Sequence, residues 1–176
     1  MADLPRIPPP VARHAGLAMM QAASIASVLE EDELICPFAV ITKGADRQSI
    51  EFEAETQEEA VAKGWSSLDE WRSEVDLWAL VREGLESTPS GKMDVLVVAA
   101  WAPGMEEPIV FTQAYSRSPD GRFSLPGPVV LLGVEEAEIR GVADAFASGI
   151  DEHPKRYLWA EWKATPNNSL ERSRER

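Results

Sequence analysis

The sequence has few of the side chains from which recognisable active sites are built. It contains one cysteine, Cys36, and two histidines, His14 and His153, in 176 residues. A single cysteine excludes an internal disulfide and a cysteine-based zinc site, and the two histidines do not have the spacing of a metal motif. We therefore assign no catalytic residue, no metal ligand and no cofactor, and we expect both histidines to be exposed near helix ends.

Basic residues are also scarce. The chain has 17 Lys and Arg against 30 Asp and Glu, which gives a net charge of −13. The lack of a basic patch argues against binding to nucleic acid and to anionic membranes. The longest uncharged apolar stretch, residues 15–29, is too short to cross a bilayer, and the first five residues lack the pattern of a secretory signal. We expect a cytoplasmic protein.

Negative charge is concentrated in one third of the chain. Between Glu30 and Glu86 there are 16 acidic and 5 basic residues, which account for 11 of the 13 net negative charges. Such a concentration predicts a strongly negative surface on one part of the molecule. A surface of this kind attracts positively charged macromolecules over long distances.

Length and composition fit one globular domain, with 44% hydrophobic and 27% charged residues. Four prolines in the first ten residues predict a Pro-rich extended arm at residues 1–10. The composition of residues 163–176 predicts a disordered charged tail. A single domain then occupies residues 11–162.

Periodicity and turn signals predict the elements of this domain. Thr56 with Glu59, and Ser67 with Glu70, have the form of capping boxes and predict two consecutive helix starts. Trp71 and Trp78 are seven residues apart, which predicts that both lie on the buried face of the second of these helices. The predicted elements are a helix at 11–31, strands at 37–42 and 50–55, helices at 57–63 and 68–86, strands at 93–101, 109–116, 122–125 and 129–132, and a helix from 135.

Hairpin connections dominate this order, so the fold class is α+β with a mainly antiparallel sheet. We expect about four to six strands flanked by three or four helices, in the order α-β-β-α-α-β-β-β-(β)-α. The element order loosely resembles that of the profilin, longin and roadblock scaffolds. The resemblance concerns element order alone, and no residue motif accompanies it.

The acidic surface favours a non-catalytic protein-binding module, such as an immunity- or antitoxin-like inhibitor, a secretion chaperone or an adaptor, that engages a basic partner protein. Within it, Glu51, Glu53 and Glu55 alternate with apolar residues and are expected to line the exposed face of a strand. Trp159 and Trp162 are expected to contact a partner, since tryptophan often anchors interfaces. They could equally hold the end of the chain to its own domain.

Two other classes of function stay open. A carboxylate-dependent enzyme, with or without a divalent metal, requires at least two acidic side chains to converge in a pocket with raised pKa values. A self-associating structural protein could pair through the alanine-lined face of the first helix, which would make a homo-oligomer.

Overall fold

The computed structural model describes residues 7–30, 32–134 and 136–165. The helices in these residues are α1 (Pro9–Val28), α2 (Gln57–Trp71), α3 (Glu136–Asp151) and α4 (Tyr157–Ala164). The strands are β1 (Phe38–Lys43), β2 (Asp46–Glu51), β3 (Leu77–Thr88), β4 (Gly91–Trp101), β5 (Ile109–Ala114), β6 (Ser116–Arg117), β7 (Phe123–Ser124) and β8 (Val130–Leu131). The predicted α+β class is confirmed.

Six of the strands form one antiparallel sheet in the order β2-β1-β3-β4-β5-β8, and β6 pairs with β7 separately. The long hairpin of β3 and β4 lies at the centre, with Val81 opposite Val98. This central place for β4 follows from its apolar run, which is buried on both sides. The predicted edge strand near residue 130 is also present, as β8 beside β5.

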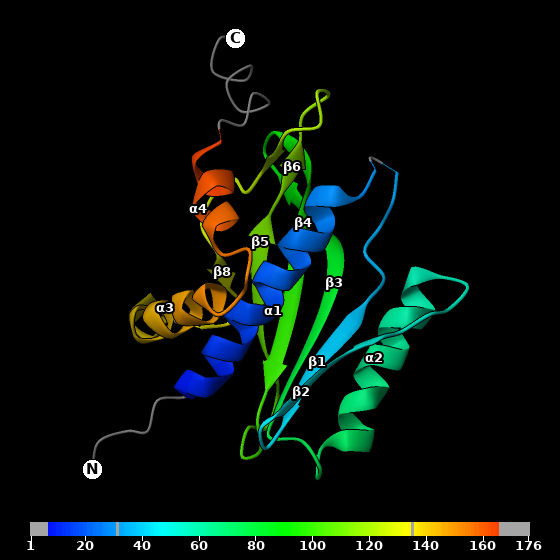
Figure 1. Cartoon of the computed structure of the whole chain (residues 1–176), viewed down its shortest axis with the longest axis vertical. Helices are drawn as coiled ribbons and strands as arrows, with labels where there is room; N and C mark the ends of the chain where they lie inside the picture. Colours follow the sequence, from blue (N-terminus) through cyan, green and yellow to red (C-terminus); the bar gives the residue numbers. More distant parts are fainter. Residues whose placement is uncertain (1–6, 31, 135, 166–176) are drawn as a thin grey trace.

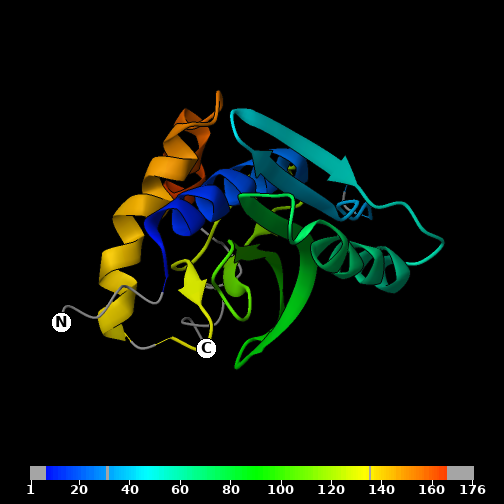
Figure 2. The same cartoon turned by 90° about the horizontal axis from the view of Figure 1, so that it is seen from below.

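Helices cover both faces of the sheet (Figures 1 and 2). α1 lies across one face with α3 beside it, and alternate strand residues such as Val81 and Val98 point into that core. α2 lies against the opposite face, where Trp78, Leu80 and Trp101 form a second, smaller core. Successive side chains of β3 point to opposite faces of the sheet, so they contribute alternately to two separate hydrophobic clusters.

The small residues of α1 allow it to pack closely within its own chain. Ala15, Ala22 and Ala26 are fully buried, and Gly16 touches the backbone of α3 at Phe146. Gly149 of α3 makes the reciprocal close approach to α1. The alanine-lined face that could have paired with a second copy is thus occupied by the sheet and by α3.

The predicted helix at 68–86 is wrong. α2 continues without a break from Gln57 to Trp71, and β3 begins at Leu77. Gly64 does not end the helix, because it packs against the Leu80 side chain of β3, where a Cβ would overlap that side chain. The observed order in the described residues has one helix where two were predicted, and a further helix, α4, near the end.

The predicted strand at 50–55 begins earlier and ends earlier in the structure. Phe52 N–H donates to the Pro37 carbonyl oxygen over 2.8 Å, but the β1–β2 pairing ends with Glu51 opposite Phe38. Pro37 has no amide hydrogen with which to extend the ladder. The alternation of acidic and apolar residues therefore continues for four residues beyond the strand.

The two ends of the domain also differ from the predicted boundaries. α1 begins at Pro9, where proline suits the first helical turn, and residues 1–6 of the predicted arm lie outside the described residues. α1 ends at Val28, so the acidic run from Glu30 begins just beyond the helix and not within its last turn. α4 includes Lys163 and Ala164 of the predicted tail, and residues 166–176 lie outside the described part.

Candidate partner-binding face

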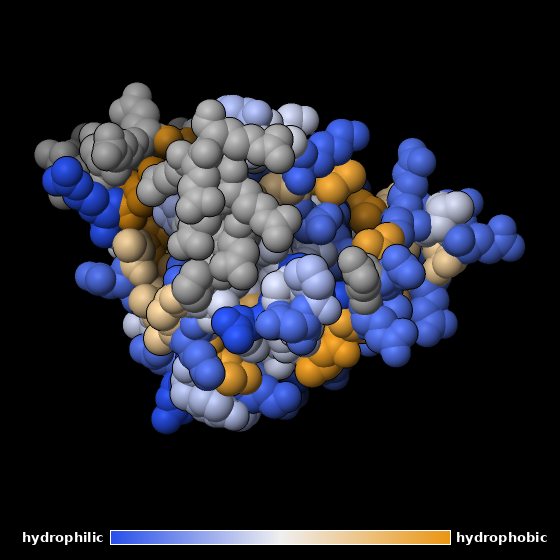
Figure 3. All heavy atoms as spheres, turned by 90° about the horizontal axis from the view of Figure 1, so that it is seen from above, coloured by the Kyte–Doolittle hydropathy of each residue, from blue (hydrophilic) through white to orange (hydrophobic). Residues whose placement is uncertain are grey.

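Acidic side chains of the central third of the chain point outward. Of those between residues 30 and 86 that the structure describes, only Glu83 is partly buried. The exposed ones are Glu30, Asp32, Glu33, Asp46, Glu51, Glu53, Glu55, Glu58, Glu59, Asp69, Glu70, Glu74, Asp76 and Glu86. Many of them belong to α2 and to the segment that leads into it. In the view of Figure 3, hydrophilic residues predominate on the side where this segment lies, with separate hydrophobic patches between them.

The three glutamates predicted from alternation are all exposed, but they do not share one strand. Glu51 is the last residue of β2, while Glu53 and Glu55 lie in the connection to α2. The Nζ atom of Lys63 in α2 donates to the backbone oxygen of Glu53 over 2.8 Å, which ties this connection to the helix. The acidic side chains remain directed to solvent.

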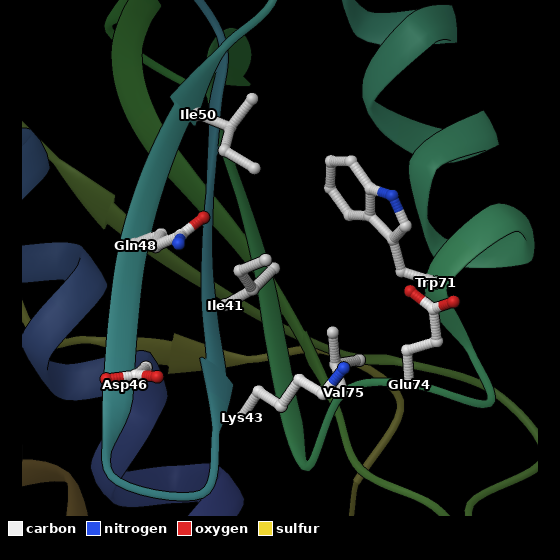
Figure 4. A pocket seen from close by; sticks show the side chains of 8 residues that line it. All are labelled: Ile41, Lys43, Asp46, Gln48, Ile50, Trp71, Glu74 and Val75. Atoms are coloured by element: carbon white, nitrogen blue, oxygen red, sulfur yellow. The ribbon is translucent and has the colours of Figure 1, made fainter.

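A groove runs between the β1–β2 hairpin and the C-terminal part of α2 (Figure 4). Its volume is about 290 Å³. Ile41 and Ile50 project from the hairpin toward Trp71 of α2, and Val75 closes one end. Lys43, Asp46, Gln48 and Glu74 form the polar part of the lining. The groove therefore combines an apolar interior with a charged rim, in the most acidic part of the chain.

Local contacts hold the helix side of the groove. Thr56 caps α2 by accepting a hydrogen bond from the Glu59 amide over 3.1 Å, as its sequence pattern predicts. Trp71 stacks on Phe52 with ring centres 6.5 Å apart. The neighbouring Arg72 places its guanidinium 5.3 Å from the ring centre of Trp101. Trp71 is half-buried, so part of the indole remains accessible in the groove.

Sequence reasoning placed Trp71 and Trp78 together in one buried helical stripe, and this pairing is wrong. Trp78 lies in β3 and is fully buried, where its Nε1 donates to Ser67 Oγ over 3.2 Å. Trp71 lies at the end of α2 and lines the groove. The signal that separates them is the apolar run from Leu77 to Val81, which is typical of a strand buried on both faces.

The other two tryptophans predicted at a contact surface belong to α4. Trp162 is 7% exposed and meets the Phe123 ring edge to face, with centres 5.1 Å apart. It therefore holds α4 to its own domain, the alternative that the sequence left open. Trp159 is half-buried beside Lys163, whose Nζ lies 5.9 Å from the centre of its ring.

His14 is buried, contrary to the expectation of an exposed position. Its Nε2 atom lies 2.7 Å from the backbone oxygen of Val40 in β1 and donates to it, whereas Nδ1 has no partner in the part of the chain that the structure describes. Burial lowers the pKa of His14, and the nearby Arg47 acts in the same direction. The lowered pKa favours the neutral form of this buried ring.

His153 and Cys36 have more accessible positions. His153 is half-buried just beyond α3, where Nδ1 accepts from the Lys155 amide over 3.0 Å, and burial lowers its pKa. Cys36 is also half-buried, and burial raises the pKa of its thiol, helped by the negative charges of Glu51 and Glu53. A raised pKa disfavours the reactive thiolate.

Glu83 is the acidic residue that departs from the outward pattern. The hydroxyl of Tyr115 donates to its Oε1 over 2.8 Å, and Oε2 is buried without a partner among the described residues. Burial raises the pKa of the Glu83 carboxyl and that of the Tyr115 hydroxyl. Sequence reasoning did not single out this pair, which 32 residues separate in the chain.

Neither a metal-binding cluster nor a membrane span is found in the part of the chain described. Residues 7–30, 32–134 and 136–165 contain no group of three His, Cys, Asp or Glu side chains that could hold a metal ion. None of the helices in these ranges is both long and apolar enough to cross a membrane.

Comparison with known proteins gives no relative. No family model, no curated protein and no solved structure matches this chain significantly. Functional inference therefore rests on the geometry of the domain itself.

Proposed function

We propose that this chain is a non-catalytic protein-binding module that engages a basic partner protein through the acidic side of α2 and the groove beside it. An immunity- or antitoxin-like inhibitor, a secretion chaperone and an adaptor are members of this class. The observation that supports the proposal is the position of the groove. Ile41, Ile50 and Trp71 offer apolar contact within the region of highest negative charge.

The two features would act at different stages of binding. Exposed carboxylates such as Glu53, Glu55 and Glu58 attract a cationic protein and raise the association rate, an effect that salt screens. Apolar contact in the groove slows dissociation, because a partly exposed tryptophan gains buried area when a partner side chain enters. A partner with an apolar side chain flanked by Lys or Arg would match both features.

Salt dependence tests the electrostatic part. The protein would be immobilised, incubated with host lysate at low salt and eluted with a salt gradient, and the eluted proteins would be identified. We expect basic proteins whose association rate falls steeply with ionic strength. If the affinity of every captured partner is unchanged between low and high salt, the steering proposal is wrong.

Two triple variants separate local charge from net charge. The first carries Glu53→Gln, Glu55→Gln and Glu58→Gln, three exposed positions of the acidic region at and before the first turn of α2. The second carries Glu106→Gln, Glu107→Gln and Glu161→Gln, all exposed and outside the acidic region. Both change the net charge equally. We expect the first to slow association about tenfold and the second to have a much smaller effect, and equal effects would contradict a local binding face.

A third comparison tests the groove. Trp71→Ala should raise the dissociation rate of a captured partner by roughly tenfold or more. Tyr157→Ala removes an aromatic residue that is 67% exposed on α4 and serves as the control. Equal dissociation rates for the two variants would show that the groove does not contribute to partner binding.

A further inference from the structure

A second cavity lies on the opposite side of the molecule, between α3, α4 and the sheet edge formed by β5 and β8. Its volume is about 290 Å³, close to the lower end of the roughly 300–1,000 Å³ typical of small-molecule pockets. Ten of its eleven lining residues are hydrophobic, among them Phe111, Leu131, Ile139 and Ile150. The remaining one is Lys163.

The ammonium of Lys163 is held by neutral groups. Nζ donates to Oε1 of Gln113 over 3.0 Å and to the backbone oxygen of Gly127. None of the salt bridges in the described ranges includes Lys163, although the chain carries 30 acidic residues. Burial lowers the pKa of this ammonium. A half-buried cation that faces neutral partners gains from the approach of an anion.

Gln113 fixes the position of this cation. Its side chain is completely buried, and its Nε2 donates to the backbone oxygens of Ala114 over 2.9 Å and Pro126 over 3.2 Å. These bonds orient Oε1 toward Lys163. An ammonium has three donors, and two are used here. The described residues leave the third donor unused, and Lys163 lines the cavity.

We propose that this cavity binds a small amphipathic carboxylate. Its apolar body lies between α3 and the sheet, and its carboxylate accepts a charge-assisted hydrogen bond from Lys163. The apolar walls favour burial of a hydrocarbon or aromatic group of the ligand. The single cation, Lys163, favours a negatively charged group at the other end of the ligand. A ligand with an apolar body and a positively charged group is disfavoured, because the Lys163 ammonium would repel its charge.

Three probes of equal chain length separate charge recognition from apolar burial. Octanoate, octanol and octylamine would each be titrated into the full chain by calorimetry at physiological ionic strength and neutral pH. We expect octanoate to bind most tightly, octanol about tenfold more weakly and octylamine more weakly still, since hydrogen bonds to charged groups exceed neutral ones. Absence of octanoate binding at millimolar concentration overturns the proposal, as does equal binding of octanoate and octanol.

Variants place the binding in this cavity. Lys163→Met should weaken octanoate about tenfold and octanol much less, and retained octanol binding shows that the cavity is intact. Lys155→Met, which removes an exposed lysine near α4, should change neither. Ala147→Phe fills the cavity from the exposed side of α3 and should abolish binding of both probes. Unchanged octanoate affinity in either the Lys163 or the Ala147 variant overturns the proposal, whether or not the other variant folds.

Discussion

The backbone at Gly149 in α3 lies so close to the carbonyl oxygen of Arg13 in α1 that a Cβ on Gly149 would overlap this oxygen. The obstacle is backbone on a buried helix, so it cannot move aside as a flexible side chain could. We therefore expect Gly149→Ala to lower the free energy of unfolding by about 3 kcal/mol or more. Urea denaturation of the purified variant measures this loss.

Gly141 provides the control within the same helix. A Cβ at this position would meet no atom within 4 Å. Gly141→Ala should therefore raise the free energy of unfolding by about 0.5–1 kcal/mol, because alanine is the better helix former. If Gly149→Ala raised the free energy of unfolding as much as Gly141→Ala, helix propensity, and not the crossing of α1 and α3, would determine the effect.

Thr56→Ala tests the cap of α2. The substitution removes the acceptor for the Glu59 amide and should cost about 1 kcal/mol of unfolding free energy. Ser66→Ala, at an exposed position inside the same helix, should be neutral or slightly stabilising. The urea midpoints of unfolding of the two variants are compared. A Thr56 variant as stable as the wild type would show that the cap does not stabilise α2.

Local chemistry in the sequence was sufficient for several elements. The Thr56 capping box predicted the start of α2, and the continuous apolar run predicted a central β4. In both cases the signal lies within one element, where propensity and periodicity act. The fold class could also be predicted from local signals, because short turns joined most of the predicted strands and such hairpins pair strands antiparallel.

The failures occur where a pattern crosses an element boundary or depends on distant residues. The spacing of Trp71 and Trp78 fits one helical face by coincidence, because the chain changes from helix to strand between them. His14 is buried and donates to the Val40 carbonyl oxygen of β1, and nothing near His14 in the sequence specifies this contact. The groove likewise needs the hairpin and α2 to meet, so no local periodicity could predict it.

His14 should make the stability depend on pH. Burial lowers its pKa in the folded protein, whereas the unfolded chain binds a proton near the ordinary value of about 6.5. The unfolded state thus holds more protons, and the free energy of unfolding falls as the pH drops below that value. Arg47 and Glu152, the charged neighbours, act in opposite directions on this pKa.

The measurement uses a His153→Gln background, so that His14 is the sole histidine. Urea denaturation from about pH 7.5 to about pH 5.5 would be compared with and without His14→Gln. We expect the loss of stability toward low pH to be smaller in the double variant. Carboxyl groups such as Glu83 titrate in both proteins, so they cancel in the difference. Identical pH profiles would contradict a neutral, buried His14.

Arg117 should stabilise the end of α1 from a distant part of the chain. Its guanidinium donates to the backbone oxygens of Ala26 and, over 2.7 Å, of Glu30. These carbonyls lie at and just beyond the negative end of the helix, where a cation is favourable. Arg117→Met should lower the free energy of unfolding by about 1–3 kcal/mol. Arg122→Met, at an exposed turn, should change it by less than about 0.5 kcal/mol.

Hydrogen exchange adds a local measurement. Only the Arg117 variant should speed amide exchange in the last turn of α1, and unchanged protection there would contradict the capping role of Arg117.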